Sequence, residues 1–154
     1  MLRLEFDGAH QAWPVFFRSC LVLIDRIDRE LESEAGLPLS WFEVLSQLGS
    51  RPGAMMPMKQ LADSICLSKS GVSRLVDRMA DRGLVKRAPC QEDGRVIFAC
   101  LTPEGRAAYE RARPAAYRCI EEHFSRHITP DEASAMTGAL MKVLSATGCQ
   151  HPGV

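Results

Sequence analysis

The sequence predicts a mainly α-helical fold of about six helices with one small β-hairpin, and three observations support this fold class. Apolar residues recur at helical spacing along most of the chain. Hydroxyl side chains, prolines and glycines divide the apolar stretches into separate helices. A single turn-rich segment, PCQEDGR, separates two runs that suit β-strands, at 84–87 and 96–101.

Length and composition predict a single domain that spans residues 1–154. A chain of 154 residues with 46% hydrophobic content can bury roughly two-thirds of its unfolded surface. The sequence has no apolar run long enough to span a membrane, and its N-terminus carries acidic residues instead of the basic start of a signal peptide. We therefore expect a cytoplasmic protein, in which the six scattered cysteines are mostly free thiols.

Charge is distributed unevenly, although the formal net charge is zero. Residues 51–106 contain ten Lys or Arg against six Asp or Glu, whereas residues 1–50 contain four against eight. The basic excess therefore coincides with the part of the chain that contains the predicted hairpin.

The first predicted helix covers residues 13–34 and has a wide apolar face. Phe16, Cys20, Leu23, Ile27 and Leu31 form one stripe, and further apolar residues lie beside it. Two interpretations stay open: part of this face contacts a partner subunit, or the helix is buried in the core of the monomer.

A second helix is expected to begin at Ser40 and Glu43, which have the spacing of a capping box, and to end at Gly49. After a loop, residues 58–65 begin a helix-turn-helix whose first helix supports the second. That second helix is expected to run from an N-cap at Ser68 to a glycine stop at Gly83.

The C-terminal third predicts two more helices within residues 103–147. Thr102 is the expected N-cap of the first, with Pro103 at its first position. The last helix opens at Thr129, where Glu132 completes a second predicted capping box.

Three motifs together resemble the MarR family of winged helix-turn-helix transcriptional regulators. They are the helix SKSGVSRLVDRMADRGLVKR, the Asp93-Gly94-Arg95 of the hairpin, and LTPEGR at the start of the next helix. The resemblance implies a DNA-binding lobe at 55–101 and a homodimer formed by the helices at 13–34 and 103–147. It also implies a repressor that binds double-stranded DNA at an inverted repeat and responds to a small effector.

The exposed face of the helix after Ser68 combines cations with short hydroxyl side chains, as a helix in the DNA major groove requires. We expect Arg74 to read a base, and Ser70 and Ser73 to donate to bases or phosphates. The family resemblance places Arg95 in the minor groove with Asp93 holding its guanidinium. The full set of expected DNA contacts is Lys59, Ser68, Lys69, Ser70, Gly71, Ser73, Arg74, Arg78, Lys86, Arg87, Asp93 and Arg95.

Three kinds of signal remain possible for the regulator. A phenolic or aromatic anion would use a cleft lined by His10, Trp13, Phe17, Arg18 and Trp41, although each aromatic residue could instead be part of the core. A thiol sensor would use Cys20, which could instead be a buried structural cysteine. A metal would bind Cys119, His123 and His127, which have helical spacing but lack a clear fourth ligand.

Two other classes of function compete with a DNA-binding regulator. The sequence lacks a glycine-rich phosphate loop, a nucleophile elbow and a supported carboxylate pair, so we expect neither an enzyme nor a cofactor. A winged helix that binds proteins is the stronger alternative. Such a module would expose apolar residues where this helix has Ser70 and Arg74.

Overall fold

The computed structural model describes residues 8–65, 67–90 and 93–147. Its elements follow in the order α1 (Gly8–Ala35), α2 (Leu39–Gly49), η1 (Pro52–Ala54), β1 (Met55–Pro57), α3 (Met58–Ser64), α4 (Lys69–Asp81), β2 (Val85–Pro89), β3 (Ile97–Leu101), α5 (Pro103–His123), η2 (Ser125–His127) and α6 (Pro130–Ala146). Here η denotes a short 3-10 helix. The predicted fold class, mainly α with a small β-hairpin, is confirmed.

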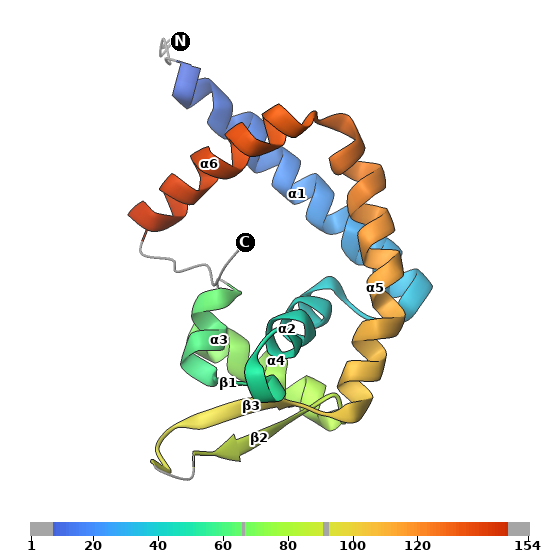
Figure 1. Cartoon of the computed structure of the whole chain (residues 1–154), viewed down its shortest axis with the longest axis vertical. Helices are drawn as coiled ribbons and strands as arrows, with labels where there is room; N and C mark the ends of the chain where they lie inside the picture. Colours follow the sequence, from blue (N-terminus) through green and yellow to red (C-terminus); the bar gives the residue numbers. More distant parts are fainter. Residues whose placement is uncertain (1–7, 66, 91–92, 148–154) are drawn as a thin grey trace, which may run out of the picture.

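The long helices and the short elements occupy different parts of the molecule (Figure 1). Helices α1, α5 and α6 form an open frame, and α2, α3, α4 and the sheet gather below it into a lobe. Strands β2 and β3 extend from this lobe as a hairpin wing. The described residues contain no helix that is both long and apolar enough to cross a membrane.

The small sheet has three antiparallel strands in the order β1-β3-β2. Met56 pairs with Ala99 in one ladder, and Val85 pairs with Leu101 in the other. Strand β1 was not predicted, because three residues that end in a proline carry no periodic signal of their own. Its pairing with β3 connects the segment before α3 to the wing.

One hydrophobic core lies inside the lobe and receives side chains from nearly every element. Helix α4 buries Val72, Leu75, Val76 and Met79, which is the apolar face that the sequence pattern predicts. The α1 contribution comes from its C-terminal part, where Leu31 is fully buried. The N-terminal part of α1 and all of α6 therefore lie outside this core.

Three predicted N-caps are confirmed. Ser68, Thr102 and Thr129 each accept a hydrogen bond on the side-chain oxygen from a backbone N–H three residues later. At Thr129 the Glu132 carboxylate also accepts from the Thr129 N–H, which completes the predicted capping box. The Thr129 N–H and hydroxyl both donate to this carboxylate, and they hold the pKa of Glu132 below its ordinary value.

The predicted glycine stop of α4 is also confirmed. Gly83 has a φ of 71°, its N–H donates to the carbonyl of Ala80, and the N–H of Leu84 donates to the carbonyl of Met79. This pair of hydrogen bonds is a Schellman motif. It turns the chain directly from α4 into β2.

The predicted capping box at Ser40 is wrong. Helix α2 begins at Leu39 with Pro38 at the N-cap position, which makes no side-chain cap hydrogen bond. A carboxylate from α1 satisfies the helix start instead, because Asp28 Oδ1 accepts from the N–H of Leu39 at 2.7 Å. The predicted start of the first helix, residue 13, is also late: α1 begins at Gly8 and contains Pro14.

Candidate nucleic-acid interface

The N-terminus of α4 is organised by the Ser68 hydroxyl. Ser68 Oγ accepts from the N–H of Gly71 at 3.0 Å and lies 3.2 Å from Ser70 Oγ. A Cβ atom at position 71 would lie 3.1 Å from Ser68 Oγ, so glycine fits this cap closely. Ser68 therefore has a structural role at this helix start, while Lys69 and Ser70 are exposed beside it.

One face of α4 presents charged groups to solvent. Arg74 and Arg78 are exposed, and together with Gly71 and Asp77 they line an open hollow of about 540 Å³. Guanidinium groups are planar donors that match guanine edges and phosphates, and an adjacent carboxylate can orient them. This face can therefore contact an anionic, hydrogen-bonding partner.

Arg87 connects the wing to α4. Its Nη2 donates to Ser73 Oγ at 2.8 Å and to the Ser73 carbonyl oxygen at 3.1 Å, and it pairs with Asp77 Oδ1 at 2.8 Å. Ser73 is half-buried under this contact. The sequence did not predict the arrangement, because Arg87 and Ser73 are fourteen positions apart on different elements.

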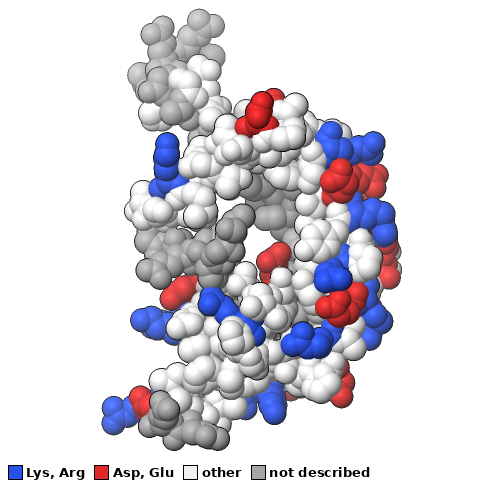
Figure 2. Space-filling model, in the orientation of Figure 1, with Lys and Arg blue, Asp and Glu red and all other residues white. Residues whose placement is uncertain are grey.

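The end of the wing is held by Asp93, although not in the predicted way. Asp93 Oδ1 accepts from the backbone N–H of Arg95 at 3.0 Å, and the carbonyl of Asp93 accepts from the N–H of Val96 at 2.9 Å. Among the described residues no ion pair joins Asp93 to the Arg95 guanidinium, so Asp93 shapes the turn and leaves the guanidinium exposed. Figure 2 shows basic and acidic side chains next to each other at the lower left of the molecule, where the hairpin of Figure 1 ends.

The remaining expected DNA contacts lie at the edges of this surface. Lys59 is exposed near the start of α3, and Lys86 is exposed on β2. Adjacent residues of a strand point to opposite faces, so Lys86 faces away from α4 while Arg87 faces toward it.

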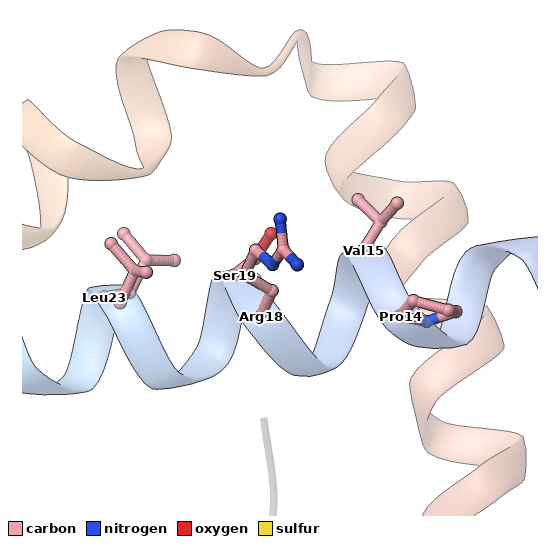
Figure 3. Close-up of a pocket in the computed structure, with 6 residues that line it drawn as sticks. Pro14, Val15, Arg18, Ser19 and Leu23 are labelled. Carbon is pink, nitrogen blue, oxygen red and sulfur yellow. The ribbon is translucent and has the colours of Figure 1, made fainter.

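The residues expected to bind an effector are not brought together. Arg18 lines an open, mainly apolar hollow of about 540 Å³ on α1, with Pro14, Val15, Ser19, Val22 and Leu23. Figure 3 shows the Arg18 guanidinium turned to the same side of α1 as Val15 and Ser19. The hollow could accept an apolar group that carries a negative charge.

The other four residues of the expected effector set do not line that hollow. Trp13 stacks on Phe17 with 5.7 Å between ring centroids, and both rings are exposed. His10 is also exposed on α1. Trp41 lies on α2, half-buried against the hydrophobic core. Val15, Ser19 and Val22, which the sequence analysis did not select, share a helix face with Arg18 and could have been found from that spacing.

The cysteine and histidine candidates lie in ordinary structural contacts. Cys20 is a half-buried free thiol. Helix α5 ends at His123, so His127 lies in η2 and breaks the expected helical spacing. His123 Nε2 lies 2.9 Å from both carboxylate oxygens of Glu30 on α1, and no group of three or more potential ligands within the described ranges is placed to hold a metal.

Comparison with known proteins agrees with this geometry. A family model described as the MarR family matches residues 35–96. The multiple antibiotic resistance protein MarR of Escherichia coli K12 is 26% identical over 120 residues, which cover 78% of this chain and 82% of that protein.

Solved structures extend the similarity to nearly the whole chain. Sco3205 of Streptomyces coelicolor, a MarR family transcriptional regulator solved in complex with DNA, is 28% identical with a TM-score of 0.84, and the match covers 94% of each chain. The organohalide-sensing regulator RdhR-CbdbA1625, solved with 2,4-dichlorophenol bound, is 21% identical with a TM-score of 0.78, over 93% of this chain and 83% of that one. The second match shows a shared fold.

Proposed function

The chain belongs to the MarR family of winged helix-turn-helix transcriptional regulators, and from this premise we propose that it is a homodimeric repressor that binds an inverted-repeat DNA operator. The observation that carries the proposal is the exposed face of α4, where Arg74 and Arg78 line a hollow beside the basic wing. A helix of this kind reads base edges with residues near its N-terminus.

Each side chain has a chemical role in this proposal. Arg74 makes a bidentate contact with a guanine, and Ser70 and Ser73 donate to base or phosphate oxygens. Arg95 enters the minor groove, where narrow A·T-rich sequence concentrates negative potential. Lys59, Lys69, Arg78 and Lys86 contact phosphates. Ser68, Gly71 and Asp93 support these residues through the helix cap and the wing turn.

Dimerisation is supported by the apolar surface outside the core. Leu21 and Ile24 on α1 are each more than half exposed, as are Tyr117 on α5 and Val143 on α6. Helix α6 has no buried residue in the monomer. The part of Figure 2 that covers α1 and α6 is largely free of charge, as expected for a surface that a second copy covers.

We further propose a small aromatic or phenolic anion as the effector. The support is the open α1 hollow, which Arg18 lines together with mainly apolar side chains. A carboxylate or phenolate that pairs with Arg18 would gain a charge-assisted hydrogen bond. A thiol signal at Cys20 stays an alternative within the same fold.

Fluorescence anisotropy with duplex DNA from the region flanking the protein's own gene tests the proposal. We expect binding that is much weaker for a shuffled duplex and that falls steeply with salt, because several phosphates are neutralised. Arg95→Ala should weaken operator binding by about 1–3 kcal/mol. Addition of 2,4-dichlorophenol or benzoate should release the DNA from the wild type but not from Arg18→Ala.

Arg126→Ala is the matched control, because Arg126 is an exposed cation in η2, far from the wing in Figure 1. It should leave DNA affinity unchanged. Absence of binding, or binding that does not respond to salt, would contradict the DNA-binding proposal. Normal release from Arg18→Ala would contradict only the effector site.

A further inference from the structure

We propose that Arg87 is a positioning residue for DNA recognition, which fixes the Ser73 hydroxyl as a hydrogen-bond donor and holds the wing against α4. The inference rests on the proposed function and replaces the phosphate contact that the sequence suggested for Arg87. Arg87 lies on the wing strand β2, and it would affect sequence specificity through its contact with α4, the helix proposed to read the bases.

A single guanidinium nitrogen of Arg87, Nη2, makes three contacts with α4. Arg87 Nη2 meets the Ser73 carbonyl oxygen, Ser73 Oγ and Asp77 Oδ1 at distances of 2.8–3.1 Å. The carbonyl group is backbone, so the contact fixes the path of α4 as well as two of its side chains. About a third of the Arg87 side chain remains exposed, whereas Asp77 is 57% exposed at the edge of the α4 hollow.

The contact restricts what Ser73 can do. A serine hydroxyl has one donor and two acceptor sites, and its hydrogen normally rotates to suit either kind of partner. Arg87 occupies an acceptor site, and its positive charge turns the O–H dipole away from the guanidinium. Ser73 is therefore presented as a donor. The base atoms that accept in the major groove are guanine N7 and O6, adenine N7 and thymine O4, whereas the cytosine amino group only donates.

The same contact makes Arg87 less available to a phosphate. Its guanidinium already has a carboxylate, a carbonyl and a hydroxyl as partners. All three contacts use Nη2, so a phosphate could approach only the Nε and Nη1 hydrogens, and the Asp77 carboxylate beside them would repel it. Lys86 has no such contact in the described structure and lies on the opposite face of β2, which makes it the matched control.

The experiment measures affinity for the operator duplex and for a shuffled duplex over a range of salt concentrations. Arg87→Ala should weaken operator binding about ten-fold more than shuffled binding, because base readout depends on the position of Ser73. Its salt slope should stay that of the wild type, since no phosphate contact is lost. Lys86→Ala should weaken both duplexes alike and reduce the slope by about 1.

Two further variants separate positioning from charge and from folding. Arg87→Lys keeps the charge but loses the planar guanidinium, so it should not restore discrimination. Ser73→Ala leaves Arg87 and the fold in place and should lose the same discrimination, and the double variant Ser73→Ala/Arg87→Ala should lose little more. A thermal unfolding scan of each variant accompanies the titrations.

The outcomes distinguish this inference from the proposed function. If the wild type binds neither duplex, the proposed function fails and the inference fails with it. If the wild type prefers the operator but Arg87→Ala behaves like Lys86→Ala, with a reduced salt slope and unchanged discrimination, only the positioning role is overturned. Additive losses in the double variant would also overturn it.

Discussion

At the scale of single residues, Glu30 connects α1 to α5. Both of its carboxylate oxygens lie 2.9 Å from His123 Nε2. The hydrogen bond with His123 lowers the pKa of Glu30 from its ordinary value of 4.5. Burial raises the pKa of the neighbouring Cys119 thiol to about 11, so this cysteine stays protonated and unreactive at neutral pH.

Glu30→Gln should lower the thermal unfolding midpoint at pH 7, because the amide is a weaker acceptor for His123. The folded state favours the Glu30 carboxylate, so its stabilising effect is present above pH 4.5 and is lost as the pH falls through the lowered pKa. The gap between wild type and Glu30→Gln should therefore close on acidification. Glu121→Gln, an exposed carboxylate on α5, is the control. A gap that persists at acidic pH would contradict this role for Glu30.

Single residues also show which parts of the site can be predicted from sequence. The cations of α4 and the wing were identified from their types and spacing, because exposure on a helix face follows from periodicity. The partner of Arg87 and the acceptor role of Asp93 in the wing turn were not identified. Asp93 accepts a backbone hydrogen bond and Arg87 pairs across two elements, and neither contact leaves a local pattern.

At the scale of elements, the junction of α4, β2 and α5 depends on the LTPEG sequence. The Thr102 hydroxyl donates toward the carbonyl oxygens of Gly83 and Leu84 at 2.6 and 2.9 Å, and its oxygen accepts from the N–H of Gly105 at 2.9 Å. One side chain thus caps α5 and ties it to the end of α4. The end of α4 and the start of α5 are therefore joined by one hydroxyl that contacts the backbone on both sides.

Gly105→Ala should destabilise this junction. A Cβ atom at position 105 would lie 1.9 Å from the carbonyl oxygen of Leu84, a backbone atom that cannot move without shifting the end of α4. We expect a loss of about 1–3 kcal/mol or more in the free energy of unfolding, measured with urea. Gly138→Ala in α6 is the matched control, because a Cβ there meets nothing within 4 Å and alanine favours a helix. Equal stability of Gly105→Ala and the wild type would contradict the close approach.

The helix boundaries show where local sequence is sufficient. Ser68, Thr102 and Thr129 cap their helices through hydrogen bonds three residues away, and all three were predicted. Ser40 has the same local pattern but does not cap a helix. The helix begins one residue earlier, at Leu39, whose N–H donates to the Asp28 carboxylate of α1. A cap supplied by a distant residue can be identified only when the packing of the helices is known.

At the scale of the whole molecule, the apolar side chains divide into two groups. The buried group fills the lobe beneath α1 and α5, and the exposed group covers the N-terminal part of α1 and α6. The wide apolar face of the first helix allowed two interpretations from sequence. Burial in the monomer core accounts for Ile27 and Leu31, while Val22 and Ile24 remain 57% exposed. The sequence could not separate these two groups, because both follow the same helical period.

Ile24→Glu should therefore convert the protein to a monomer without unfolding it. The side chain is exposed in the single chain, so a carboxylate there costs little until a second copy covers it. Sedimentation equilibrium should give twice the chain mass of 17.1 kDa for the wild type and the single mass for the variant. Operator affinity should fall together with dimerisation, because one subunit reaches only one half-site.

Ser33→Glu introduces the same charge at an exposed polar position near the other end of α1 and should remain dimeric. A wild type that sediments as a monomer at micromolar concentration would contradict the dimer, and so would an Ile24→Glu protein that keeps the dimer mass. If Ile24→Glu is monomeric but binds the operator as tightly as the wild type, the proposed dimer interface stands. The proposal that both half-sites must be bound is then wrong. If two half-sites must be bound at once, the distance between the two α4 helices of the dimer controls DNA affinity. A ligand at Arg18 would then release the DNA by changing that distance.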